Sequence, residues 1–223
     1  MHKKLSACAR CKISSTEKAC MVQGGKGPVF CPTNNLESLI KSVAKKYQEA
    51  GTLEFARQAS IQEAECYVDR ENNILHPVKP RLQEIIEFAG KMGYKTIGLT
   101  FCAGLSKEAS ALDEVLKNSG FNVVSVCCKV GCVPKEELGL NDFQKVRQGR
   151  FESMCNPVAQ AEILNEAKTD FNILLGLCVG HDSLFFKNAL APTTVFAVKD
   201  RVLAHNPLGS IYTLHTYYQR FRN

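Results

Sequence analysis

The feature that most constrains this fold is an alternation of short apolar segments with amphipathic ones, which begins at Arg81. Apolar segments at 96–102, 122–128, 172–178 and 193–198 predict four strands. Residues 81–93, 107–118, 157–167 and a segment from 182 carry apolar residues at helical spacing. The strands are apolar almost throughout, which is typical of a parallel sheet covered on both faces. The sequence therefore predicts an α/β fold, a three-layer sandwich with a mostly parallel sheet.

The part of the chain before this core differs in pattern. Residues 1–35 are rich in glycine and proline and lack helical or strand periodicity, so we expect them to fold around a metal. Residues 36–51 and 53–68 show helical spacing, and residues 69–80 read as a loop. We expect three parts: a metal-binding segment at 1–35, a helical connection at 36–80 and an α/β core at 81–223.

Eleven cysteines in 223 residues call for a chemical explanation. No apolar run reaches the roughly 18 residues of a membrane span, and the start lacks a signal-peptide pattern, so we expect a cytoplasmic protein. In a reducing compartment, many cysteines indicate metal, iron–sulfur or thiol chemistry. The net charge is +6, but Lys and Arg are scattered, so we expect no nucleic-acid partner. The oligomeric state stays open.

The first group of cysteines follows the pattern C-x2-C-x8-C-x10-C. It consists of Cys8, Cys11, Cys20 and Cys31. A tight pair brings two thiolates to one ion, and the later pair completes a tetrahedron. A closed four-cysteine site is typical of structural zinc. The Cys31-Pro32 dipeptide also ends ferredoxin-type motifs, so an iron–sulfur cluster stays open as the alternative to zinc at this site.

The second group of cysteines lies at or near strand ends. Because the carboxyl ends of parallel strands share one edge, we expect these sulfurs to meet there. Cys155 stands before Asn156-Pro157, a helix start that lowers a thiol pKa. Cys127 and Cys128 point to opposite faces, so one of them serves the site. The predicted ligands of a second metal or iron–sulfur cluster are Cys102, Cys127, Cys128, Cys155 and Cys178.

Polar residues follow the last two predicted strands. An imidazole beside a carboxylate ligates metal or moves protons, and a lysine binds an anionic substrate. We therefore expect a pocket for a small-molecule substrate at this edge. Its predicted catalytic residues are His181, Asp182, Lys199, Asp200 and His205.

Several stretches carry a resemblance to a known family. They are Cys8-Ala-Arg-Cys11, Phe101-Cys102-Ala-Gly-Leu105, Val126-Cys127-Cys128-Lys-Val-Gly131, Met154-Cys155-Asn-Pro157, Leu177-Cys178-Val-Gly-His181-Asp-Ser-Leu184 and Val198-Lys-Asp-Arg-Val-Leu-Ala-His205-Asn-Pro207. The chain resembles the uncharacterised cysteine-rich, predicted metal-binding proteins of bacteria and archaea, a domain of unknown function. The resemblance implies metal binding and a Cys/His site, with no established reaction. Cys132 departs from the family pattern.

These observations favour a metal-binding protein that is an iron–sulfur or metal-dependent enzyme acting on a small molecule. Cysteines beside an open coordination position suit lyase or oxidoreductase chemistry. Two alternatives stay open: a non-catalytic metal carrier or redox sensor, and a zinc-stabilised ligand-binding protein. Neither a phosphate-binding loop nor a dinucleotide fingerprint is present in the sequence.

Overall fold

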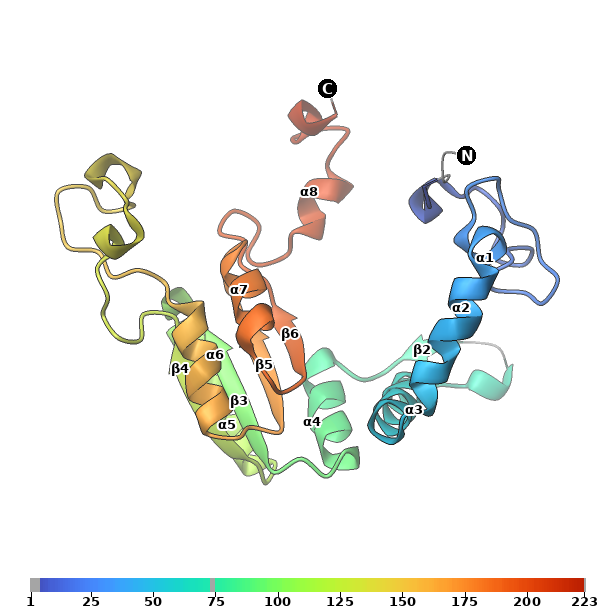
Figure 1. The fold of residues 1–223 in the computed structure, drawn as a ribbon, viewed down its shortest axis with the longest axis horizontal. Helices are drawn as coiled ribbons and strands as arrows, with labels where there is room; N and C mark the ends of the chain where they lie inside the picture. The colour runs from blue at the N-terminus through green and yellow to red at the C-terminus, as the bar shows by residue number, and fades with distance from the viewer. Residues whose placement is uncertain (1–4, 73–74, 223) are drawn as a thin grey trace. The chain divides into compact units, whose positions relative to one another are not determined.

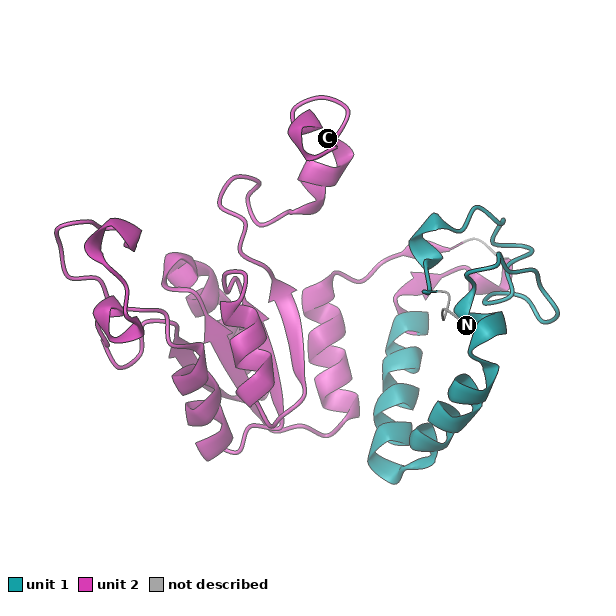
Figure 2. Ribbon diagram, turned by 45° about the horizontal axis from the view of Figure 1, so that its top comes forward, with its two compact units in different colours: residues 1–64 teal, residues 65–223 magenta. Residues whose placement is uncertain are grey.

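The computed structural model describes residues 5–72 and 75–222, and the chain divides into two compact units, 1–64 and 65–223 (Figure 2). The division falls inside the segment 36–80 that the sequence assigns to a helical connection. Among the described residues, no helix has the length and apolar character needed to span a membrane.

The first unit is helical after an irregular start. Its helices are α1 (Pro32–Asn35), α2 (Glu37–Ala44) and α3 (Ala50–Glu65), the last ending in the next unit. The sequence predicts helices over 36–51 and 53–68. The first predicted helix ends too late and the second both starts and ends too late. A short 3-10 helix, Lys45–Gln48, follows α2, and the extended backbone of Glu49 ends it. Gly51 therefore lies inside α3.

The second unit begins with a small antiparallel pair, β1 (Tyr67–Val68) with β2 (His76–Pro77). The sequence places Tyr67 and Val68 at the end of a helix, but an aromatic and a β-branched residue favour a strand. The amide of Val78 donates to the carbonyl of Cys66 and extends the pairing. The predicted loop 69–80 thus contains a strand, and its residues 73–74 lie outside the described part.

The core of the second unit is a four-stranded parallel sheet in the order β4-β3-β5-β6 (Figure 1). Its strands are β3 (Thr96–Phe101), β4 (Asn122–Cys127), β5 (Phe171–Leu175) and β6 (Thr193–Ala197). The helices of this unit are α4 (Arg81–Lys91), α5 (Ser106–Asn118), α6 (Pro157–Glu166), α7 (His181–Asn188) and α8 (Leu208–Tyr212). The predicted α/β class and parallel sheet are confirmed, although each predicted strand runs one to three residues past the observed end and β5 begins one residue before its predicted start.

Helices cover both faces of the sheet because the strand order reverses once. The chain passes from β3 outward to β4 through α5, then back across β3 to β5 through α6, and on to β6 through α7. Right-handed crossovers in opposite directions put α5 on one face and α6 with α7 on the other. Figure 1 shows α6 and α7 side by side in front of the strands.

The sheet is buried as its composition predicts. Ile97 and Leu99 of β3 are fully buried, and so is every residue of β5. Leu164 of α6 and Phe185 of α7 pack with Leu174 in the core on one face. This rigid layer fixes the positions of the residues that follow the strands.

One long connection interrupts the regular pattern between β4 and α6. Residues 129–155, which we call the 129–155 loop, contain two short 3-10 helices, Lys135–Leu138 and Asp142–Gln144. The two arms of the loop pair as an isolated antiparallel bridge between Pro134 and Ser153. The amide of Met154 also donates to the carbonyl of Val133 at 2.8 Å, so the loop returns to the sheet edge beside its starting point.

Candidate functional site: a cysteine pocket at the sheet edge

Backbone hydrogen bonds carry the sheet ladder past the strand ends. The amide of Cys102 donates to the carbonyl of Leu175 at 3.1 Å, and that of Cys128 donates to Phe101 at 2.8 Å. The amide of Asn156 donates to the carbonyl of Cys128 at 2.8 Å, which holds Cys155 at the same edge. Three cysteines distant in sequence are therefore brought to one place by the parallel pairing.

Beyond β5 the chain turns sharply at Gly176. Its φ is +68°, and an added Cβ would lie only 2.1 Å from Cδ1 of Leu105, so only glycine fits there. The turn leads to Cys178 and then to Gly180, whose φ of +85° starts α7 at His181. Cys178 and His181 thus reach the edge where Cys102 and Cys128 lie.

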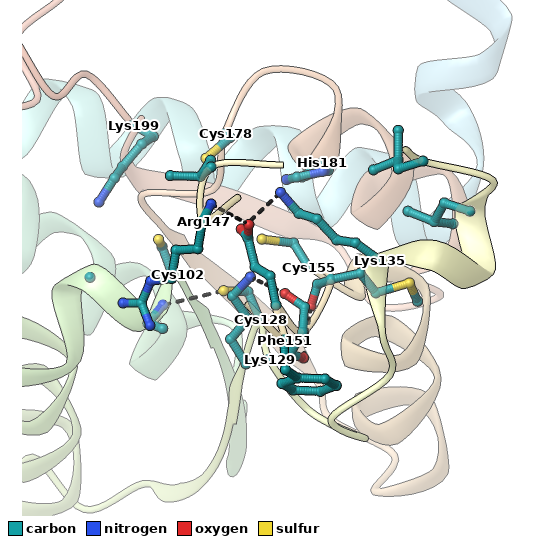
Figure 3. A pocket seen from close by; sticks show the side chains of 18 of the residues that line it. Cys102, Cys128, Lys129, Lys135, Arg147, Phe151, Cys155, Cys178, His181 and Lys199 are labelled. Carbon is teal, nitrogen blue, oxygen red and sulfur yellow. Dashed lines mark hydrogen bonds and ion pairs between the residues drawn. The ribbon is translucent and has the colours of Figure 1, made fainter. Parts of the chain in front are cut away.

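These side chains line a cavity of about 760 Å³, which we call the cysteine pocket (Figure 3). It contains six of the residues that the sequence predicts for the second site: Cys102, Cys128, Cys155, Cys178, His181 and Lys199. A volume of this size is typical of sites for small molecules.

Cys102 and Cys128 form a coupled pair. Cys128 is 2% exposed, and its thiol hydrogen-bonds the sulfur of Cys102. That contact is the largest cause that lowers the pKa of Cys102 to about 5, and the Gly104 amide and the Lys199 cation add to it. The pKa of the Cys128 thiol is raised, first by its contact with Cys102, then by Cys155 and by burial. The amide of Ala103, 3.3 Å from the Cys128 sulfur, opposes this rise.

Cys155 lies on the other side of Cys128. The hydrogen bond from Cys128 is again the largest cause that lowers the pKa of Cys155 to about 5. The charges of Lys129 and His181 lower it further. The directions of these shifts favour a protonated Cys128 between ionised Cys102 and Cys155.

Cationic side chains lie beside the sulfurs of Cys178 and Cys102. Nη2 of Arg201 lies 3.1 Å from the sulfur of Cys178. Lys199 follows β6, and its amide donates to the carbonyl of Leu177 at 3.2 Å. A Cβ at Gly104 would lie 3.1 Å from Nζ of Lys199, so this glycine leaves room for the ammonium beside Cys102.

His181 has one buried nitrogen without a partner. No group in the described part of the chain hydrogen-bonds its Nδ1, although this atom is hidden from solvent. A buried polar atom of this kind is costly unless a hydrogen-bond partner or a metal satisfies it. His181 therefore lines the pocket with one nitrogen whose binding capacity is unused.

The 129–155 loop contributes pocket residues that the sequence did not single out. They are Lys129, Lys135, Leu138, Leu140, Val146, Arg147, Phe151, Glu152, Ser153 and Met154. Nζ of Lys135 pairs with Glu152 at 2.8 Å, and Nζ of Lys129 donates to the carbonyl of Ser153 at 2.6 Å. Arg201, which the sequence places with Lys199 as a candidate for binding an anionic substrate, also lines the pocket. For Lys129, the position directly after the strand-end cysteines was the available signal.

Four predicted residues do not line the pocket. Cys127 ends β4 and packs against the core cluster. Oδ1 of Asp182 accepts from the amides of Gly180 and Ser183, and Oδ1 of Asp200 accepts from Val202 and Leu203. Nδ1 of His205 lies 3.1 Å from the Asp200 amide. These three polar side chains hold turns outside the pocket lining. Their catalytic roles stay predictions.

The N-terminal cysteines lie in the first unit, on segments held close together. The guanidinium of Arg10 sits 5.4 Å from the ring centroid of Phe30, which brings the neighbours Cys11 and Cys31 into one region. Gly27 approaches Cys31 so closely that an added Cβ would lie 2.8 Å from its sulfur. The amide of Asn34 lowers the pKa of the Cys31 thiol.

The residue types of both cysteine groups fit a soft metal or an iron–sulfur cluster, because thiolates and an unpartnered imidazole are their usual ligands. All eleven cysteines carry free thiols. Within residues 5–72 and 75–222, however, no three Cys, His, Asp or Glu side chains are arranged around a common point that would hold an ion. The donor chemistry fits, and metal binding at either group stays a prediction.

Comparisons with known proteins agree with the resemblance inferred from the sequence. Residues 31–196 match the family described as "Protein of unknown function (DUF1847)". The protein named "Uncharacterized protein MJ0455" from Methanocaldococcus jannaschii is 46% identical over 177 residues, which cover 79% of this chain and 85% of the relative. No solved structure matches the chain.

Proposed function

The chain belongs to this family of proteins of unknown function, and we propose that it is a metal- or iron–sulfur-dependent enzyme acting on a small molecule at the cysteine pocket. One observation carries the proposal. Cys128 contacts both Cys102 and Cys155 in a cavity that is also lined by His181, whose buried Nδ1 has no hydrogen-bond partner among the described residues. A pocket with perturbed titratable groups and an unused nitrogen is the usual form of an active site.

The sulfurs of Cys102, Cys128 and Cys155 would hold the metal or cluster, with Cys178 on the same cavity as a fourth candidate ligand. When bound, it supplies a Lewis acid or an electron, as lyase or oxidoreductase chemistry requires. The contacts with Cys128 chiefly favour the ionised forms of Cys102 and Cys155, and the cations of Lys199 and Lys129 add to this. His181 lines the pocket near Cys155 and is the candidate general acid or base.

We propose a separate zinc or iron–sulfur site at Cys8, Cys11, Cys20 and Cys31. The contact of Arg10 with Phe30 and the close approach of Gly27 to Cys31 support it, because both compact the segment around these thiols. Among residues 5–35, which the structure describes of this segment, Cys31 alone is a buried apolar residue, so metal ligation is the available source of folding energy. The proposed setting is the reducing cytoplasm, where such thiols stay unpaired.

A redox sensor is the second candidate, and the coupling of the three sulfurs favours it. A peroxide would oxidise the thiolate of Cys102 or Cys155 to a sulfenic acid, and the neighbouring sulfur of Cys128 would then displace water to form a disulfide, which a cellular thiol reduces again. In this case the pocket would work without metal and would alternate between thiols and a disulfide that includes Cys128.

Metal analysis of anaerobically purified protein separates the two candidates. We would measure metal and sulfide per chain and the visible spectrum for the wild type, Cys102→Ser, Cys155→Ser and the control Cys132→Ser. Cys132 is exposed and does not line the pocket, so its replacement tests for a general effect of losing a thiol.

The proposed enzyme predicts that both pocket variants lose the metal of one site while Cys132→Ser retains the wild-type content. Equal metal content in all four proteins would rule out a pocket metal. If an oxidised wild-type sample then yields a disulfide containing Cys128 by peptide mapping, the sensor is the better description.

A further inference from the structure

The cysteine pocket is lined by two chemically different sets of side chains. The first set, which we call the basic wall, includes Lys199, Arg147 and Arg201. The second set, which we call the apolar wall, includes Leu138, Val146 and Phe151 of the 129–155 loop. Such a pairing matches a ligand with a charged group at one end and an apolar body at the other.

The charge of the pocket favours an anion. Five cationic residues of the described chain line it, against the single acidic side chain of Glu152. Even with Cys102 and Cys155 ionised, positive charge remains in excess. Electrostatic attraction in a partly enclosed site is stronger than in bulk water.

Most of these cations already have partners, and one does not. Lys135 pairs with Glu152 at 2.8 Å, and Lys129 donates to Ser153. Arg201 contacts Cys178 at 3.1 Å. The guanidinium of Arg147 makes no hydrogen bond or ion pair with any part of the chain that the structure describes; only its backbone amide is bonded, to Glu152. Its planar fork of donors suits a carboxylate.

The apolar wall is exposed, whereas the loop is organised around a buried charge. Nζ of Lys145 lies 2.7 Å from Glu136 and 2.8 Å from Asp142, and its side chain is 5% exposed. Val146 and Phe151 are 85% and 61% exposed while they line the pocket. Large exposed apolar side chains on a cavity are typical of a ligand site.

We propose that the pocket takes a small organic anion, a carboxylate with an apolar body. Its charged group lies at Arg147 and Lys199, within reach of the cysteine sulfurs, and its apolar body lies against Val146 and Phe151. The inference rests on the proposed function in treating this anion as the substrate.

Isothermal titration of the full-length protein with acetate, butanoate, hexanoate and hexan-1-ol tests both walls. The apolar wall predicts that affinity rises about threefold for each added methylene. The basic wall predicts that hexanoate binds at least about tenfold more tightly than hexan-1-ol, since the alcohol lacks the charge. Equal affinities for acetate and hexanoate, or for hexanoate and hexan-1-ol, would overturn the proposal with the wild type alone.

Matched variants in the same loop test which wall binds the carboxylate and which binds the hydrocarbon chain. Arg147→Gln should weaken hexanoate about tenfold and leave hexan-1-ol unchanged, whereas Arg150→Gln, which lies outside the pocket lining, should change neither. Phe151→Ser should weaken hexanoate and spare acetate, with Phe143→Ser as its control. If each control behaves like its partner variant, the proposal is wrong.

This titration requires neither metal nor turnover. Loss of the carboxylate preference would therefore contradict the ligand class while leaving the metal analysis to decide the proposed function. A pocket that binds hexanoate but holds no metal would contradict the proposed function and support the ligand class.

Discussion

The thiol of Cys128 hydrogen-bonds the sulfur of Cys102, and this contact moves the two pKa values in opposite directions. The pKa of Cys102 falls to about 5 and that of Cys128 rises. Cys128 has the same effect on Cys155, whose pKa also falls to about 5. Because metals and electrophiles react with the thiolate, this arrangement keeps two reactive sulfurs at neutral pH without an external base.

Replacing Cys128 with Ala should raise the pKa of both Cys102 and Cys155 toward the ordinary value of 9.0, because the largest cause of each shift is removed. The ultraviolet absorbance of thiolates, followed against pH in metal-free reduced protein, reports this directly. The control Cys132→Ala removes an exposed thiol. Titration midpoints that stay near pH 5 in Cys128→Ala would show that another group ionises these sulfurs.

The same shifts make stability depend on pH. In the folded protein Cys102 and Cys155 lose their protons near pH 5, whereas the unfolded chain keeps them until about pH 9. Between these values the unfolded state binds more protons, so the free energy of unfolding rises with pH. This contribution is complete above about pH 9 and is lost as the pH falls through about 5. Urea unfolding of metal-free protein between about pH 5 and 9 should show this rise in the free energy of unfolding with pH. The rise should be smaller in Cys128→Ala.

The position of most pocket residues follows from parallel pairing alone. Cys102 and Cys128 stand one residue beyond neighbouring strands, and Lys199 two residues beyond β6, so a sequence that predicts the strands also predicts their meeting. Of the adjacent pair Cys127 and Cys128, the structure brings Cys128 to the pocket. The alternation of side chains along a strand predicts that one of the two points toward the site. Which of them does so depends on how the chain packs beyond the end of the strand.

The other half of the pocket could not be predicted in this way. Arg147 and Phe151 belong to the 129–155 loop, which has neither helical nor strand periodicity and is organised by the buried Lys145. Conversely, Asp182 and Asp200 looked catalytic by proximity to the strand ends. Short carboxylates near a turn cap backbone amides, and the sequence alone does not separate that role from chemistry.

Gly176→Ala should destabilise the protein by about 2 to 4 kcal/mol, because it adds both left-handed backbone strain and a steric clash with Leu105. Gly149→Ala is the matched control. Gly149 has a φ of +70° and no atoms within 4 Å of an added Cβ, so it should lose only about 1 kcal/mol. Chemical denaturation measures both. Equal losses would mean that Leu105 yields and that Gly176 is not needed for close packing.

Cys8→Ser and Cys31→Ser should each release the N-terminal metal and expose the chain to proteolysis before about residue 36, since ligation supplies the folding energy of this segment. Metal analysis and limited proteolysis, read by mass spectrometry, test the two effects together. Cys132→Ser should retain the wild-type digestion pattern. Unchanged metal content in both N-terminal variants would refute the four-cysteine site.

The central claim is that the cysteine pocket holds a metal or cluster, and anomalous X-ray diffraction from anaerobically grown crystals tests it most directly. The account predicts an anomalous peak in the pocket at the metal's absorption edge, with the sulfurs of Cys102, Cys128 and Cys155 at about 2.3 Å from it. A strong peak at the N-terminal cysteines together with none in the pocket would contradict the claim.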